Sequence, residues 1–122
     1  MATATESNEE VTGGIAALEL AGRIDSTTAP GLQDQMVRLV KSGCKGLIVD
    51  FKQVMYISSA GFRALLIAAQ LGEGTRCSLA LCGLGVEVRR MFEMGAFDQV
   101  FTILATREEC AAHLATASPG AT

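Results

Sequence analysis

Two adjacent serines, Ser58 and Ser59, are the residues of this chain whose type and position best suit chemistry. They follow an apolar, β-branched run, Gly46–Phe51, which predicts a strand buried on both faces, and a connector over residues 52–57. The residues from Ser58 onward have helical periodicity, so the serines open a helix. A hydroxyl at that position can cap a free backbone N–H group. It can also receive a phosphoryl group, because the free N–H groups and the positive end of the helix dipole tolerate negative charge.

The residues that follow the serines each have two interpretations. Gly61 falls inside the first turns of the predicted helix, where glycine costs about 1 kcal/mol relative to alanine. It therefore indicates a close approach, either of a partner or of a neighbouring backbone. Phe62 is either a core residue or a partner contact. Arg63 is either an ordinary exposed charge or a guanidinium near a phosphate.

A second polar segment precedes an earlier predicted helix. Residues 26–28, Ser-Thr-Thr, are all N-cap candidates, and Pro30 suits the first turn, where its missing N–H group costs nothing. This helix extends to about Lys41. Gly43 can adopt the left-handed conformation just after its end.

The rest of the chain alternates strands and helices. The further predicted strands are Ile15–Ala21, Ser78–Cys82 and Val100–Leu104, with a weaker one within Thr3–Val11, and the further helices are Val86–Met94 and a last one after Thr106. Thr106 and Glu109 have the spacing of a capping box. This order predicts a single α/β domain with a mostly parallel sheet of four or five strands and about four helices.

Composition narrows the classes of function. The formal net charge of -3 argues against nonspecific nucleic-acid binding, which needs Lys and Arg to neutralise phosphates. No apolar run reaches the roughly 20 residues that span a bilayer. The polar, acidic start lacks the cationic and apolar regions of a secretory signal, so we expect a cytoplasmic protein without a membrane span.

Catalytic and metal sites find no support in the residue pattern. The chain has four cysteines, Cys44, Cys77, Cys82 and Cys110. They form no CxxC pair and are expected to be small buried hydrophobes. His113 is the only histidine, no GxSxG motif surrounds Ser59, and no cluster has metal-ligand spacing. We therefore predict no enzyme activity, no metal and no cofactor.

One segment, Ile57–Leu66, resembles the signature of STAS-domain anti-sigma factor antagonists. Three more segments resemble the same family in the same order, namely Gly22–Pro30, Leu47–Phe51 and Val86–Gly95. The resemblance covers about residues 11–115, the expected STAS-like domain. Residues 1–10 are then a flexible acidic N-terminus or a weak first strand, and residues 116–122 a flexible tail.

The resemblance implies a phosphorylation switch. In this family the unphosphorylated protein binds an anti-sigma factor that is itself a Ser/Thr kinase, and this binding frees the sigma factor. Phosphorylation of a serine at the start of the second helix dissociates the complex, and a metal-dependent Ser/Thr phosphatase reverses it. Alignment on Gly61 places that serine at Ser59. Several family members carry Asp just before that serine. This chain has Ser58 there, which leaves two candidate hydroxyls and makes Ser58 the alternative phosphorylation site.

The resemblance also implies a partner surface formed by the loop before the first helix and the start of the second. Its expected residues are Asp25, Ser26, Thr27, Ser58, Ala60, Gly61, Phe62 and Arg63. A capping turn is an equal alternative for Asp25 and its neighbours.

Two other functions compete with the switch. A STAS scaffold or a transporter-associated STAS subunit would bind its partners without a phosphate cycle. A small hydrolase that uses Ser59 would need a base close to it, and His113 is the only histidine available.

Overall fold

The fold is one five-stranded sheet with helices on both faces. The computed structural model describes residues 6–116. The strands are β1 Glu6–Thr12, β2 Ile15–Ile24, β3 Gly46–Ile57, β4 Ser78–Cys82 and β5 Thr102–Leu104, and the helices are α1 Ala29–Lys41, α2 Ser59–Thr75, α3 Val86–Met94 and α4 Arg107–Thr116, with a 3₁₀ turn, η1, at Phe97–Gln99. The strand order is β1-β2-β3-β4-β5, with β1 antiparallel to β2 and each later pair parallel. The predicted α/β domain with a mostly parallel sheet is confirmed, and the weak first strand forms a hairpin with β2.

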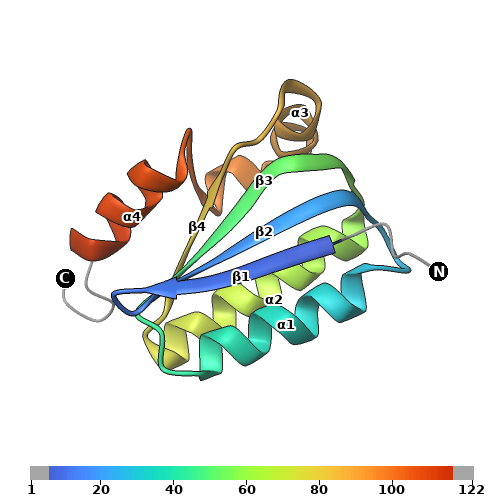
Figure 1. The fold of residues 1–122 in the computed structure, drawn as a ribbon. Helices are drawn as coiled ribbons and strands as arrows, with labels where there is room; N and C mark the ends of the chain where they lie inside the picture. Colours follow the sequence, from blue (N-terminus) through green and yellow to red (C-terminus); the bar gives the residue numbers. More distant parts are fainter. Residues whose placement is uncertain (1–5, 117–122) are drawn as a thin grey trace.

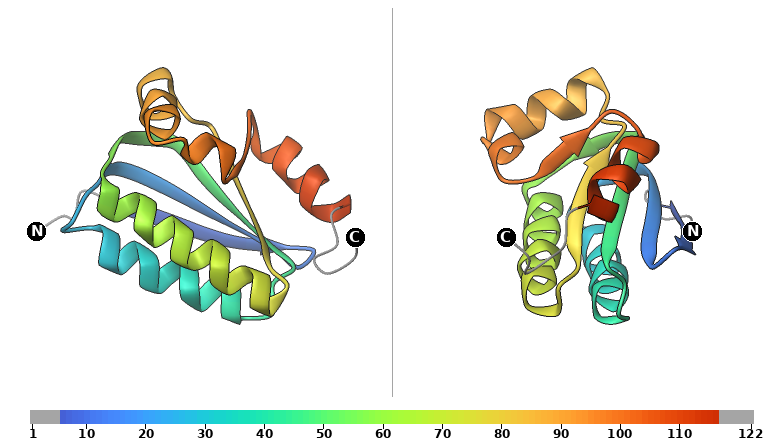
Figure 2. Two further views of the ribbon diagram at one scale, coloured as in Figure 1. Left: turned by 180° about the vertical axis from the view of Figure 1, so that it is seen from behind. Right: turned by 90° about the vertical axis from the view of Figure 1, so that its left-hand side faces the viewer.

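The helices are divided between the two faces of the sheet. α1 and α2 lie side by side along one face, and α4 lies on the other (Figures 1 and 2). The main core fills the space between the sheet and the α1–α2 layer, where Leu18, Met36, Val49 and Leu65 are fully buried. A smaller core lies beneath α4 and includes Cys110. Parallel strands thus direct their carboxyl ends, and the helix starts that follow them, toward one end of the molecule.

Two strands are longer than predicted. β3 includes residues 52–57, which the sequence predicts as a connector, and β2 continues to Ile24. The two extensions pair with each other, for example Gly22 with Val54 after a first register shift and Ile24 with Ile57 after a second. The connector prediction was wrong because a partner strand, and not the local residue pattern, extends the ladder here.

The last strand is shorter than predicted. β5 contains only Thr102–Leu104, while η1 precedes it. Phe101 belongs to the predicted apolar run but packs edge-on against Phe92 in the core, with ring centroids 6.1 Å apart. Core packing, rather than strand pairing, accounts for the apolar character of this part of the run.

Most helix ends follow their predicted signals. Gly43 follows α1 with a φ of 96°. The Thr106 hydroxyl accepts the Glu109 N–H at 3.1 Å, and the Glu109 carboxylate accepts the Ala105 N–H at 3.1 Å, a variant of the predicted capping box. α4 extends through Thr116, the first residue of the predicted tail. The remainder of that tail and residues 1–5 lie outside the described residues.

Candidate functional site

The start of α2 is anchored to the end of β2. Ser58 is the N-cap residue, with an extended backbone (φ -97°, ψ 177°), and α2 begins at Ser59. The Ser58 N–H donates to the Ile24 carbonyl at 2.8 Å, and the Phe62 N–H donates to the Ser58 carbonyl at 3.1 Å. Both backbone polar groups of Ser58 are therefore hydrogen-bonded, and these bonds fix the position of Ser59 at the start of α2.

The two candidate hydroxyls have opposite environments. Ser59 is exposed. The Ser58 Oγ atom is buried and has no hydrogen-bond partner among the described residues. Ser58 makes no capping bond with its side chain, so its hydroxyl does not satisfy the first-turn N–H groups of α2. A modifying enzyme can reach Ser59 in this conformation but not the Ser58 hydroxyl.

Asp25 and Thr28 shape the loop before α1. Asp25 Oδ1 accepts the N–H groups of Thr27 at 3.0 Å and of Thr28 at 3.3 Å. Thr28 Oγ1 accepts the Asp25 N–H at 3.0 Å and donates to the Arg23 carbonyl at 2.9 Å. Thr28 takes the N-cap position of α1, although its side chain makes no capping bond. The loop is thus a turn closed by Asp25, and it leaves Ser26 and Thr27 exposed.

Two substitutions test whether the acceptor oxygen of Asp25 stabilises this turn. Asp25→Asn keeps an acceptor oxygen for the Thr27 and Thr28 N–H groups and removes the charge, whereas Asp25→Ala removes both. We expect Asp25→Ala to lower the free energy of unfolding by about 1 kcal/mol, and Asp25→Asn by less than half of that amount. Urea denaturation measures both values. Equal losses would show that the turn does not depend on the acceptor oxygen.

A groove joins this loop to the start of α2. Its volume is about 240 Å³, and it is lined by Ser26, Ala29, Pro30, Gln33, Asp34, Ala60 and Arg63. The structure therefore brings together Ser26, Ala60 and Arg63, three of the residues predicted for the partner surface. Gln33 and Asp34 were not predicted. The sequence spacing could have indicated Asp34, because it lies about one helical turn after Pro30 and therefore on the same face of the helix.

Gly61 and Phe62 face the core. A Cβ atom on Gly61 would lie 2.7 Å from Ile57 Cγ1 and 2.8 Å from Ile24 Cγ2. The glycine therefore lets α2 pack closely on side chains at the ends of β2 and β3. Phe62 is 7% exposed and stacks on Phe97 with ring centroids 4.2 Å apart. In this structure both residues position α2 and present no open surface to a partner.

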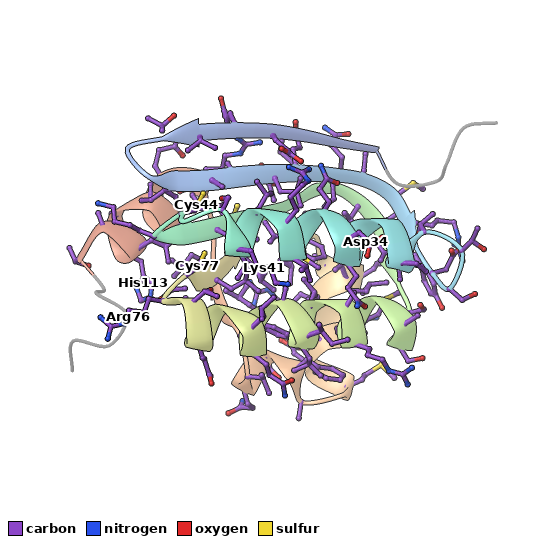
Figure 3. The ribbon with its side chains drawn as sticks, turned by 90° about the horizontal axis from the view of Figure 1, so that it is seen from below. Asp34, Lys41, Cys44, Arg76, Cys77 and His113 are labelled. Atoms are coloured by element: carbon purple, nitrogen blue, oxygen red, sulfur yellow. The ribbon has the colours of Figure 1, made fainter. Side chains whose placement is uncertain are left out.

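A larger cavity, about 410 Å³, lies toward the other end of α2 and is lined in part by Gly72, Cys77 and His113. Gly72 is thirteen residues further along α2 than Ser59, which corresponds to about 20 Å. Figure 3 shows His113 and Cys77 at this end, with Asp34 toward the other. His113 is therefore too far from Ser59 to act as its general base, and it was the residue on which the hydrolase alternative depended.

The cysteines are free thiols within the core or at its border. Cys77, Cys82 and Cys110 are buried, and Cys44 is partly buried. Burial raises the pKa of the Cys77 thiol to about 11. The pKa of Cys82 is also raised, chiefly by a hydrogen bond with Cys110 and then by burial. Cys77 and Cys82 are neutral at pH 7 and serve as small apolar residues, as predicted.

The described residues offer neither a metal site nor a membrane-spanning helix. No group of three or more His, Cys, Asp and Glu residues there is arranged to hold a metal ion. None of the helices in residues 6–116 combines the length and the apolar character that crossing a membrane requires.

Comparison with known sequences identifies the domain. The sequence model of the STAS domain matches residues 6–110. BtrV of Bordetella bronchiseptica, provisionally named an anti-sigma factor antagonist, is 34% identical over 100 residues. The match covers 82% of this chain and 86% of BtrV.

Solved structures share the fold. An anti-sigma factor antagonist from Mycobacterium paratuberculosis superposes with a TM-score of 0.82 at 22% identity, over 91% of this chain and 94% of that one. Unphosphorylated SpoIIAA gives 0.76 at 18% identity, over 93% and 98% of the two chains. Phosphorylated SpoIIAA, a Bacillus cell fate determinant, gives 0.68 at 17% identity, over 89% and 99%. The match to the STAS domain and the 34% identity with BtrV show that the chain belongs to the STAS-domain family of anti-sigma factor antagonists.

Proposed function

We propose that this protein works by partner switching. In its unphosphorylated form it binds an anti-sigma factor that is a Ser/Thr kinase, and it thereby frees a sigma factor for transcription. Phosphorylation of Ser59 releases the protein from the kinase, and a metal-dependent Ser/Thr phosphatase restores the binding form. The cycle runs in the cytoplasm, and the protein itself binds rather than catalyses. The similarity to SpoIIAA, whose structures are described in phosphorylated and unphosphorylated forms, supports this proposal.

The modification is a phosphoryl transfer to Ser59 Oγ. The serine oxygen attacks the γ-phosphorus of ATP held by the kinase, and the bond from that phosphorus to the bridging oxygen of ADP breaks. The serine proton passes to a base of the kinase. The phosphatase later hydrolyses the ester to the serine hydroxyl and inorganic phosphate.

The contrast between the two serine hydroxyls carries this proposal. Ser59 is exposed in the first turn of α2, whereas the neighbouring Ser58 Oγ is buried. A kinase must bring the hydroxyl into its own active site, so this contrast favours Ser59 over Ser58. Ala60, the next residue, lines the groove shared with Ser26 and Arg63. A group added to Ser59 therefore alters the surface next to that groove.

The charge of the phosphate is large enough to switch an interface. It adds about -1.5 to -2 at pH 7. A hundredfold loss of affinity needs only about 2.8 kcal/mol, and an unpaired charge buried between two proteins costs about 2–5 kcal/mol. The helix start itself tolerates the charge, so we expect the fold to survive the modification.

Three variants of the full chain test the switch against the kinase recovered with it from the source cell. We expect Ser59→Ala to bind like the wild type but to stay bound when ATP is added. Ser59→Asp is expected to bind at least tenfold more weakly, because it places a permanent charge at the helix start. Gln70→Glu is the matched control, since it adds one charge at an exposed position about three turns further along α2. Calorimetry measures affinity, and mass spectrometry locates the phosphate.

Each outcome has a defined meaning. If ATP dissociates the wild-type complex, and only Ser59→Ala resists, Ser59 is the switch. Phosphate found on Ser58 would overturn the assignment of Ser59. If all variants bind alike and no phosphate appears, a STAS scaffold or a transporter-associated subunit without a phosphate cycle becomes the better description.

A further inference from the structure

The buried hydroxyl of Ser58 needs a physical explanation. Its Oγ atom has no hydrogen-bond partner among the described residues. Leaving a buried polar group unpaired costs about 1–3 kcal/mol, and such groups are rare in folded proteins. The sequence suggests an obvious partner, since serine at an N-cap usually accepts a first-turn N–H group. Ser58 occupies that position and makes no such bond.

The backbone does not prevent the missing bond. Ser58 has the extended conformation typical of N-cap residues, with φ -97° and ψ 177°. Its N–H is bonded to the Ile24 carbonyl at 2.8 Å, and its carbonyl accepts the Phe62 N–H at 3.1 Å. Both backbone groups are therefore held in place, and rotation about χ1 is the motion by which the hydroxyl can gain a partner. Ser58 directly precedes Ser59, and its side chain makes no hydrogen bond to the first turn of α2.

A phosphate on Ser59 would supply the missing acceptor. It brings three strongly accepting oxygens to the residue that directly follows Ser58. The first-turn N–H groups of α2, at Ser59, Ala60 and Gly61, receive no bond from the Ser58 side chain and point toward the same helix end. A hydroxyl that donates to a dianion forms a short, charge-assisted hydrogen bond, about twice as strong as a neutral one.

We infer that Ser58 is a positioning residue of the switch, whose hydroxyl is unpaired in the unmodified protein and donates to the phosphate once Ser59 is phosphorylated. This inference rests on the proposed modification of Ser59. It gives the two serines different roles, one as the phosphate carrier and one as the donor that holds the phosphate against the start of α2. Phosphorylation then also caps the helix.

The side chain at position 58 should decide how the domain responds to phosphorylation. Threonine keeps the donor hydroxyl. Alanine removes it and also removes the unpaired oxygen. Aspartate replaces the donor with a second negative charge beside the phosphate, which destabilises the modified form.

The experiment installs phosphoserine at position 59 during translation, so that no kinase is needed. The full chain is prepared with and without the phosphate in the wild type, Ser58→Thr and Ser58→Ala. In the unmodified form we expect Ser58→Ala to be as stable as the wild type or slightly more stable, because it removes an unpaired buried oxygen. In the phosphorylated form we expect its Tm to fall below that of the phosphorylated wild type by about 4 °C. Ser58→Thr should follow the wild type in its response to the phosphate.

Phosphorus NMR gives a second readout that a merely structural role would not move. A donor bonded to the dianion favours the ionised form, so the pKa of the phosphate should be lower in the wild type and Ser58→Thr than in Ser58→Ala. An identical effect of Ser58→Ala on both forms, together with an unchanged phosphate pKa, would overturn the inference. A failure of the kinase-binding test leaves this result unaffected, because the phosphate is introduced directly.

Discussion

Gly72→Ala is expected to destabilise the protein strongly, whereas Gly74→Ala, two residues later in the same helix, is expected to stabilise it. A Cβ atom on Gly72 would lie 2.2 Å from the Cys77 carbonyl oxygen. The same two residues share a backbone hydrogen bond, with the Cys77 N–H donating to the Gly72 carbonyl at 2.8 Å. The backbone that leads into β4 therefore cannot retreat from α2 without losing that bond.

The two substitutions are expected to change the free energy of unfolding in opposite directions. We expect Gly72→Ala to lower the free energy of unfolding by about 3 kcal/mol or more, as overpacking against rigid backbone does. Gly74 is exposed, and an added Cβ would meet nothing within 4 Å. Alanine there should add about 0.5–1 kcal/mol through helix propensity and the entropy of the unfolded chain. Urea denaturation gives both values, and similar values for the two variants would contradict the close approach of α2 to Cys77.

These glycines mark a limit of what the sequence can predict. The segment Leu71–Gly74 predicts the end of the helix there, because glycine is common just past helix ends. In the structure α2 continues through Thr75, and Arg76 takes the left-handed position with a φ of 62°. Glycine is required at position 72 by contact with the Cys77 carbonyl, which lies just beyond the end of α2, and the sequence pattern does not distinguish Gly72 from Gly74.

The candidate site shows a division between local and long-range causes. The helix start at the two serines and Pro30 in the first turn of α1 were predicted from short segments, because capping chemistry is local. The burial of the Ser58 hydroxyl was not predictable, since Ser58 is pinned by the Ile24 carbonyl from another strand. Asp34, which lines the groove, was not predicted for a similar reason, because α1 and α2 come together only in the folded protein.

Arg107 holds the clearest long-range interaction that the residue pattern did not reveal. Its Nε donates to Asp50 Oδ2 at 2.8 Å, and its Nη1 lies 2.8 Å from Glu10 Oε1. Glu19 is 3.8 Å away from Nη2. One guanidinium on α4 thus faces carboxylates from β1, β2 and β3 at once. The hydrogen bond with Asp50 raises the pKa of Arg107 further, so it remains a cation at any working pH.

Arg107→Met is expected to lower the free energy of unfolding by about 3 kcal/mol. Asp50 is only 4% exposed, so loss of the guanidinium leaves a buried carboxylate without its counter-charge. The pair with Glu10 adds little to this figure, because that side chain is 68% exposed and screened by water. Methionine preserves much of the apolar stem, so the loss measures the charge rather than the packing. Urea denaturation provides the value.

A second substitution shows whether the uncompensated charge causes that loss. Asp50→Asn in the Arg107→Met background removes the buried charge but keeps an oxygen for the Lys52 N–H, which Asp50 Oδ1 accepts at 2.9 Å. We expect the double variant to recover more than half of the stability lost by Arg107→Met, although Asp50→Asn alone destabilises the wild type. Such strong non-additivity is the signature of a coupled pair. Additive losses would instead mean that Arg107 acts independently of Asp50 and that the carboxylate is solvated well enough without it.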